Sequence, residues 1–427
     1  MKKTLLTGLA LLLSASAFTL HAQRDNRKES GVTTIINGVN AAPSDSTNVE
    51  NTFKGNAPET PNDNGLPRFA LVGKDRAFYL GIGAQFLGEG VYSWGADVNS
   101  PVDFTPSAFT PSAPGNGGST QFAWQTSSFY LNFVAMPGSN NQLGLFIKLN
   151  FTGANNDINL AHVYAKYRGL TIGKTNSAFT DGAAMPMTID NEGPNGYPDL
   201  SLFTAYWHQD FTKHFSGAIG IDAPSAELTE GNGAKFVNQR IPAIPLYLQY
   251  AWAGGTSHVR LSGIVRTLQY RDLAKGNNHA ITGGGIQLSG VTGIVGNLGA
   301  SFNAAYGSGI ASYFQDDNGL NLDAVAVSDA GTMKPVKTFG ITGGLTYAFS
   351  PKVSSNVSYS HLVNWLPDGA LNTGDMYRNG DYVAANVIWT VNKFISAGVE
   401  YDYGRRSHFD GSSLHANRLQ AQFALTF

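Results

Sequence analysis

RLQAQFALTF, Arg418–Phe427, ends the chain with two kinds of side chain in strict alternation. Every second residue back from Phe427 to Leu419 is apolar, and the residues between them are mostly polar. A period of two is that of a β-strand, whose successive side chains point to opposite faces of the sheet. The stretch therefore predicts a strand with one apolar face and one wet face, ending on an aromatic residue.

The N-terminal stretch MKKTLLTGLALLLSASAFTLHAQ has the layout of a secretory signal peptide. Two lysines precede an apolar core from Leu5 to Leu13, and small residues follow up to Ala22. A membrane anchor is disfavoured because this core is shorter than the roughly 20 residues that a spanning helix needs. We place the cleavage site after Ala22, so residues 1–22 are predicted to be removed on export across the inner membrane.

The composition excludes several classes of protein. Loss of the signal peptide removes two lysines and no acid, so the formal net charge moves from −2 to −4 and gives no indication of nucleic-acid binding. The chain has no cysteine, which excludes a disulfide framework, a thiolate zinc site and a cysteine nucleophile. Charged residues make up only 14%, against about 25% in ordinary globular domains. The low charge favours residence in a membrane.

Transmembrane helices are not predicted, since no run after the signal peptide approaches the ~18 uninterrupted apolar residues of a spanning helix. The alternative is a closed β-barrel, in which every backbone N–H and C=O is paired. Such a barrel predicts repeated segments of alternating character. They occur at 143–151, 258–266, 338–349, 382–391 and 397–403. Ile264 is an apolar exception on the polar face of its segment.

A soluble β-sandwich also has alternating strands, but the connections favour a barrel. Short connections such as 168–169 alternate with long ones such as 308–335, and aromatic residues gather at strand ends next to the short turns. We predict an all-β, transmembrane, antiparallel up-and-down β-barrel of about sixteen strands, with the N- and C-termini in the periplasm. Fourteen or eighteen strands stay open as alternatives, because strand boundaries are uncertain by about 2–4 residues.

The predicted strands are 77–94, 127–136, 142–152, 158–168, 170–177, 201–211, 214–223, 244–253, 257–268, 279–289, 294–307, 337–349, 353–361, 381–391, 394–404 and 416–427. They assign residues 68–427 to the barrel. Residues 23–67 are rich in Asn, Thr, Gly and Pro, and are predicted to be a flexible periplasmic extension. Phe427 closes the last strand, and this ending resembles the recognition signal of the barrel-assembly machinery.

Three stretches carry a narrower resemblance, to the DcaP-like porins. FALVGKDRAFYLGIGAQFLGEGVYSW, Phe69–Trp94, resembles that family's first strand with its lead-in loop. AHVYAKYRGLTIGKTNSAF, Ala161–Phe179, is similar to its strand–turn–strand around a Gly-Gln-Thr-Trp element, with Lys174 and Asn176 in place of Gln and Trp. Thr188–Gly196 resembles an Asp-x-x-Gly-Pro-like loop of the family. The resemblance implies a homotrimeric outer-membrane porin that passes small, often anionic, solutes.

The residues that line a channel follow from the strand faces. The long segment 180–199 is predicted to fold back inside as the constriction, and it carries Asp181, Asp190 and Glu192. The basic residues predicted on inner faces are Lys148, Lys166, Arg168, Lys174, Arg260, Arg266 and Arg418. Acids and bases on opposite sides would impose a transverse field on a solute. Each acid could equally be a solvated loop charge, and Lys166 and Arg168 could lie at the periplasmic mouth.

No enzyme signature accompanies these charges, because the chain has no Gly-x-Ser-x-Gly elbow and no His-Glu-x-x-His pair. No cofactor is predicted, and the calcium-like stretch 315–323 lacks the closing Glu of that motif. Two function classes stay open. One is a diffusion channel, favoured by inner-face glycines such as Gly340 and Gly344 that leave space. The other is an envelope adhesin or receptor that uses long loops on a filled barrel. Both predict contact with outer-membrane lipid and lipopolysaccharide.

Overall fold

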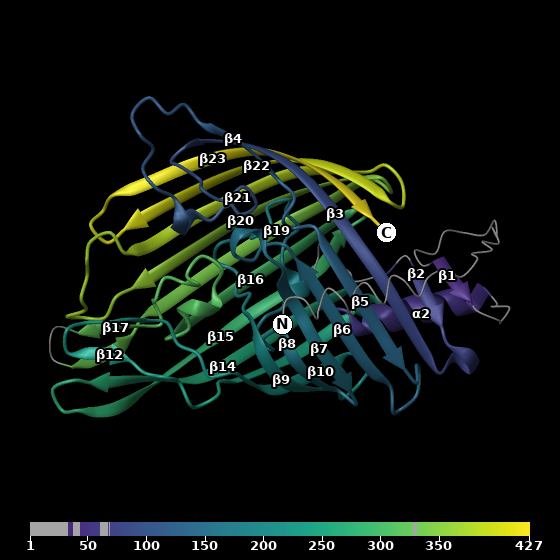
Figure 1. Ribbon diagram of the computed structural model, residues 1–427, viewed down its shortest axis with the longest axis horizontal. Helices are drawn as coiled ribbons and strands as arrows, with labels where there is room; N and C mark the ends of the chain where they lie inside the picture. Colours follow the sequence, from purple (N-terminus) through teal and green to yellow (C-terminus); the bar gives the residue numbers. More distant parts are fainter. Residues whose placement is uncertain (1–32, 37–42, 60–66, 68, 328–330) are drawn as a thin grey trace.

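The computed structural model describes residues 33–36, 43–59, 67, 69–327 and 331–427, so the predicted signal peptide lies outside the described residues. Within them, sixteen strands pair in chain order into one continuous sheet. Figure 1 shows these strands side by side as the wall of a barrel. The last of these strands pairs antiparallel with the first, with Ala416 opposite Gly95 and Thr426 opposite Gln85. Closure leaves no unpaired edge, which is the condition for a sheet in hydrocarbon. The predicted sixteen-stranded barrel is confirmed.

The barrel strands are β3 (Phe78–Gly95), β5 (Ser128–Ala135), β6 (Leu143–Asn150), β7 (Asn159–Tyr167), β8 (Leu170–Asn176), β9 (Ser201–Asp210), β10 (Phe215–Asp222), β13 (Ile244–Trp252), β14 (Ser257–Asp272), β15 (Asn277–Val295), β16 (Leu298–Ser308), β19 (Lys337–Ser350), β20 (Val353–Trp365), β21 (Tyr377–Thr390), β22 (Ile395–His408) and β23 (Ser413–Thr426). Each predicted strand has its counterpart. The largest difference is in β15, which is predicted over 279–289 and spans Asn277–Val295.

The two faces of each strand differ as the alternation predicts. In β23, Leu419 is 53% exposed and Phe423 is 45% exposed, whereas Arg418 and Gln420 are buried. The exposed set faces outward, where lipid would cover it, and the buried set faces the lumen. The C-terminal Phe427 continues this outward set and exchanges two backbone hydrogen bonds with Ala84 of β3.

All the connections at one end of the barrel are short, and the long loops lie at the other end together with the tight turns 273–276 and 409–412. At the short-turn end, Arg168 and Gly169 link β7 to β8 with φ of 49° and 83°, a left-handed turn that glycine accepts readily. The C-terminus lies at this same end, because β23 pairs there with the start of β22. This is the topology of an up-and-down barrel with periplasmic turns.

The remaining elements lie outside the set of barrel strands. The strands among them are β1 (Thr33–Ile36), β2 (Phe69–Val72), β4 (Ser119–Ala123), β11 (Leu228–Thr229), β12 (Ala234–Phe236), β17 (Ala324–Val327) and β18 (Thr332–Pro335). The helix is α2 (Pro43–Asn56), and the short 3-10 turns are η1 (Lys74–Arg76), η2 (Pro106–Ala108), η3 (Ala154–Asn156), η4 (Gly182–Ala184), η5 (Ala253–Gly255) and η6 (Ala311–Tyr313). In the part of the chain that the structure describes, no helix is both long and apolar enough to span a membrane.

The N-terminal stretch differs from the flexible extension that the sequence predicts. α2 carries Val49 and Phe53, which are buried against Tyr79 of β3 and Val134 of β5. Tyr79 and Val134 belong to the inward set of their strands, since Phe78 and Phe133 alternate with them on the outer face. The described part of 23–67 therefore includes a helix that packs on the inner wall, because its two apolar residues contact an apolar patch there.

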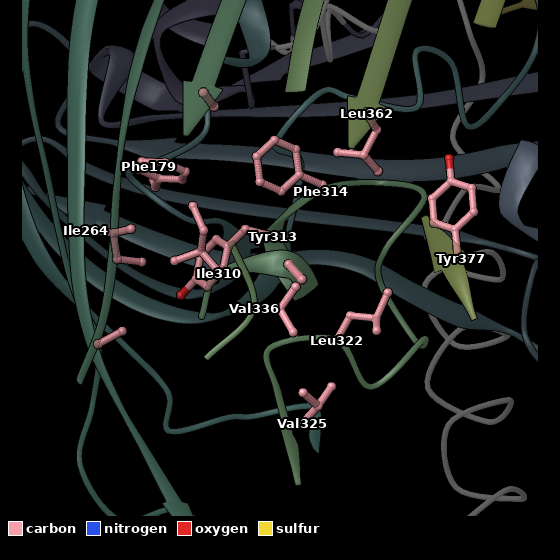
Figure 2. Packing of buried hydrophobic residues seen from close by; sticks show 13 residues of the cluster. Phe179, Ile264, Ile310, Tyr313, Phe314, Leu322, Val325, Val336, Leu362 and Tyr377 are labelled. Atoms are coloured by element: carbon pink, nitrogen blue, oxygen red, sulfur yellow. The ribbon is translucent and has the colours of Figure 1, made fainter. Parts of the chain in front are cut away.

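An apolar cluster fills part of the lumen toward the long-loop end. It joins the segment between β16 and β19, including Ile310 and Phe314, to Phe179 and to Ile264 of β14, as Figure 2 shows. Ile264 is the residue that breaks the alternation of its strand. It points inward because it packs against this cluster, so the exception has a structural reason.

Candidate constriction site

The segment between β8 and β9, residues 177–200, folds inward; we call it the constriction loop. Its start is fixed to the wall by Asp181, whose carboxylate lies 2.9 Å from His258 Nε2 of β14 and accepts a hydrogen bond of 2.6 Å from Ser289 Oγ of β15. The Tyr197 hydroxyl donates to the Asp181 carbonyl and ties the two arms of the loop together. The segment predicted to form the constriction therefore lies inside the barrel, and its role in permeation stays a prediction.

The far part of the constriction loop is held on another part of the wall by Glu400 of β22. The Glu400 carboxylate accepts the backbone N–H of Ile189 at 2.8 Å and that of Asp190 at 2.7 Å. Asn386 and Gln420 donate to the same carboxylate at 2.7 and 2.8 Å, so its position is fixed from both neighbouring strands. The loop therefore reaches from β8 and β9 to β22 and is fastened there. We call this contact the Glu400 latch.

Inner-face glycines mark the path of the loop along the wall. A Cβ at Gly340 would lie 2.2 Å from the Gly196 carbonyl oxygen, and a Cβ at Gly344 would lie 2.8 Å from Pro186. No larger residue fits at Gly340 without moving loop backbone. The sequence interpretation that these glycines leave open space is wrong, because the constriction loop occupies it.

Arg260 and Arg266, the two basic residues predicted on the inner face of β14, are both buried and paired. Arg260 is 3.0 Å from Glu59 and 3.6 Å from Asp181, and it lies over the Tyr247 ring at 4.3 Å. Arg266 is 3.1 Å from Asp323 of the long segment between β16 and β19. Both guanidiniums face inward as predicted. In this conformation each is neutralised by a carboxylate that the chain itself supplies.

Arg418 and Lys148 also face the lumen. Arg418 is fully buried, donates from Nη2 to the Ser100 carbonyl at 2.5 Å and lies over the Phe104 ring at 5.2 Å. It therefore braces the loop after β3 instead of standing free. Lys148 lies on the inner side of β6, next in the alternation to the buried Phe146, and is partly exposed. Its partly exposed side chain therefore lies in the lumen.

The three basic residues near the β7–β8 turn have different positions. Lys166 faces inward and its Nζ donates to the Gly55 carbonyl at 3.0 Å. Arg168 lies at the rim, where it donates to the Asn140 carbonyl and the Asn141 side chain of the neighbouring short turn. The prediction that Lys174 faces inward is wrong. It lies on the outer face of β8, paired in register with the outward Phe203, because Thr175 takes the inward position beside it.

The acids of the constriction loop lie among other acids. Asp190 accepts the Phe104 N–H at 2.8 Å and the Tyr382 hydroxyl at 3.0 Å. Burial raises the pKa of the Asp190 carboxyl to about 7, against the opposing effect of the Arg418 guanidinium. Burial and the nearby Asp316 carboxylate raise the pKa of Glu192. The opposed acidic and basic sides that the sequence predicts are not seen at Asp181, which pairs directly with Arg260.

Several residues that shape the site were not found by sequence reasoning. They are Glu400, His258, Asp316 and Asp323, all buried. Glu400 had a usable signal, since it is an acid on an inward position of a strand whose outer residues are apolar. Asp316 accepts the Tyr377 hydroxyl at 2.7 Å and the Ser107 N–H at 3.2 Å, a role that only the inward folding of distant loops reveals.

The cluster around Asp181 does not have the order of a hydrolase triad. Ser289 donates to Asp181 and not to His258, so the serine–histidine contact of such a triad is not formed. Among the described residues, no group of three or more His, Cys, Asp or Glu side chains could hold a metal ion. The polar contacts of the site hold the constriction loop against the inner wall of the barrel.

Comparison with known proteins gives the fold its name. No family model matches the chain, and no curated protein matches it. The outer membrane channel DcaP of Acinetobacter baumannii is similar in structure with a TM-score of 0.70 at 20% identity, over 82% of this chain and 98% of that chain. The chain has the porin fold. The resemblance to DcaP-like porins that the sequence motifs suggest is confirmed at the level of the fold.

Two other solved structures share this porin fold more distantly. An anion-selective porin from Comamonas acidovorans has a TM-score of 0.51 at 9% identity, over 82% of this chain and all (100%) of that chain. OmpT of Vibrio cholerae in its trimer form has a TM-score of 0.50 at 11% identity, over 82% of this chain and 100% of that chain. At these identities the likeness concerns the path of the chain and not its side chains.

The porin fold and the raised pKa of Asp190 together predict a pH-dependent constriction. A carboxyl whose pKa is raised in the folded loop favours the seated loop at low pH, and this contribution is lost as the pH rises through about 7. We expect single-channel conductance to rise between about pH 4 and pH 7, the interval between the ordinary pKa of an aspartate and its raised pKa in the seated loop. Asp190→Asn, which cannot ionise, should flatten this rise. A conductance that falls over the same interval would contradict the sign.

Proposed function

We propose that this protein is an outer-membrane porin through which small polar solutes diffuse. The observation that carries the proposal is the constriction loop, which enters a closed barrel and is fastened across it by the Glu400 latch. A loop that narrows a wet, charged lumen is what size selection requires. The similarity of fold to an outer membrane channel and to an anion-selective porin supports the same role.

The charge preference depends on the basic and acidic side chains that line the inner wall. Arg260 and Arg266 are paired with carboxylates and Arg418 is buried, so these three groups contribute little to ion selectivity. We propose weak selectivity with a small preference for anions, because Lys148 and Lys166 lie on the inner faces of β6 and β7. Reversal potentials in a salt gradient measure this preference directly. A cation-over-anion ratio above one would overturn it.

The proposed setting is the bacterial outer membrane. The apolar outer face of the strands suits outer-membrane lipid, with lipopolysaccharide around the long loops, and Phe427 suits recognition by the barrel-assembly machinery. We propose a homotrimer, which the trimer form of the structurally similar OmpT supports. Migration of the unheated protein in a denaturing gel, compared with the heated protein, tests the trimer.

A second candidate is an envelope adhesin or receptor on a filled barrel. The apolar cluster around Ile310 and Phe314 favours it, since this cluster packs loop residues inside the lumen. Planar-bilayer recordings separate the two candidates. A porin gives discrete conductance steps, and swelling of liposomes in sugars and amino acids then ranks solutes by size. A reconstituted, folded barrel that gives no steps would overturn the porin proposal.

A further inference from the structure

The end of α2 and the three residues after it, 49–59, lie inside the short-turn mouth of the barrel. Figure 1 shows α2 toward the end where the C-terminus and the short turns lie. Phe53 is fully buried and meets the Tyr79 ring edge-to-face at 6.3 Å. Ala57 is buried against Tyr130, Phe146 and Tyr164 of the inner wall. The segment thus packs through apolar contacts against the inner wall.

Hydrogen bonds fix the same segment in register with the wall. Asn56 Nδ2 donates to Asn132 Oδ1 at 2.7 Å, and Asn132 Nδ2 donates in return to the Phe53 carbonyl at 2.9 Å. The Tyr164 hydroxyl donates to the Asn56 carbonyl at 2.7 Å, and Lys166 donates to the Gly55 carbonyl at 3.0 Å. These four hydrogen bonds hold both the backbone and the Asn56 side chain of the segment against the wall, so they define a specific docked position.

The docked segment separates two cavities. The outer cavity, about 560 Å³, opens at the short-turn end and is bordered by Gly55, Asn56 and Glu59. The inner cavity holds only about 80 Å³, between Ala57–Glu59 and the constriction-loop residues Thr180 and Gly182. Since one water takes up about 30 Å³ in the liquid, the inner cavity has room for a few waters and for no sugar. Residues 49–59 therefore narrow the passage ahead of the constriction loop.

One guanidinium links the segment to the constriction loop. Arg260 pairs with Glu59 at 3.0 Å, and the same group donates to the Thr180 carbonyl at 3.2 Å and lies 3.6 Å from Asp181. The Glu59 side chain is 61% exposed, so water reaches this pair more easily than the buried Arg260–Asp181 pair. The Glu59 pair is thus the contact that can open first while Arg260 keeps a carboxylate partner.

We propose that residues 49–59 are an inner gate of the channel, docked by Asn56 and Glu59 and coupled to the constriction loop through Arg260. The gate rests on the proposed porin function. Its undocking opens the outer cavity to the constriction loop, and its docking closes the mouth from within. The contacts of the gate are few beside the strand pairing of the barrel, so it can leave without unfolding the wall.

A release variant tests the gate on the full chain. Glu59→Ala removes the ion pair, and Gly144→Ala places a Cβ 1.9 Å from Asn56 Oδ1, which expels that amide from its seat. Gly299→Ala is the matched control, because its Cβ would make only an ordinary 3.5 Å contact with the Thr292 carbonyl on another part of the wall. Since the chain has no cysteine, Ala57→Cys added to each protein reports undocking through its rate of labelling by a charged thiol reagent.

We expect labelling of the introduced thiol to speed up about tenfold in the release variant, equivalent to about 1.4 kcal/mol, and not in the control. Conductance should rise severalfold in the release variant alone. Equal conductance steps in both proteins would overturn the gate and leave the porin intact. Rapid labelling in the unmodified background would also overturn the gate, because the segment would not be docked. Silence from both proteins would overturn the porin and the gate together.

Discussion

Replacing Glu400 by alanine is expected to let larger solutes through the barrel. The change removes the acceptor for the Ile189 and Asp190 N–H groups, so the constriction loop loses its fastening on β22. A hydrogen bond to a charged acceptor contributes roughly 1.5–3 kcal/mol, and each 1.4 kcal/mol is about tenfold in population. Loss of both bonds should raise the open fraction of the loop on the order of 100-fold. Liposome swelling in a series of sugars of increasing size measures the change.

Two variants control for the loss of a lumen charge. Glu400→Gln keeps an acceptor oxygen in place and should stay close to the original size limit. Glu89→Ala removes an equally buried inner-wall acid that bonds Thr126 and Gln422 and not the constriction loop. If Glu89→Ala enlarges the size limit as much as Glu400→Ala does, the effect is one of lumen charge and the latch has no special role.

The wall of the barrel could be predicted because lipid imposes a repeating rule on it. Most outward residues are apolar and many inward residues are polar, so the pattern in Arg418–Phe427 recurs wherever a strand crosses. Lys174 is charged and is predicted to face inward, yet the alternation along β8 places it on the outer face. Leu170 and Ile172 are outward, and simple alternation from them already places Lys174 on the same side.

The inside of the barrel could not be predicted in the same way. A loop that folds into a wet lumen contacts polar side chains of the wall. Neither the loop sequence nor the polar wall positions carry a repeating pattern that predicts which residues will be in contact. The Glu400 latch joins positions 210 residues apart, and the Arg260–Glu59 pair joins positions 201 apart. Two signals were available, namely acids at inward strand positions such as Glu400 and the inner-face glycines. Gly340 and Gly344 mark where loop backbone or Pro186 approaches the wall, yet a glycine alone does not say what fills its space.

Breaking the ion pair between Arg266 and Asp323 is expected to destabilise the segment between β16 and β19. Arg266 on β14 is 2% exposed and Asp323 in the segment between β16 and β19 is fully buried, with 3.1 Å between them. Asp323→Leu leaves a buried guanidinium that cannot lose its proton. Breaking one side of a buried pair costs about 3–5 kcal/mol. We expect the amides of 309–327 and 331–336 to exchange hydrogen at least ~100-fold faster, as measured by mass spectrometry.

The double variant Arg266→Met with Asp323→Leu distinguishes an unpaired charge from a packing defect. A buried ion pair replaced by apolar groups of similar size is often neutral in stability or better, because neither charge must then be desolvated. Met at 266 would keep contact with the Tyr313 ring, over which the guanidinium lies at 5.2 Å. Exchange in the segment should therefore return most of the way to its original rate. If the double variant exchanges as fast as Asp323→Leu alone, the segment is held by the shape of the aspartate and its three hydrogen bonds from Ser312 and Glu227, and the pairing of charges contributes little.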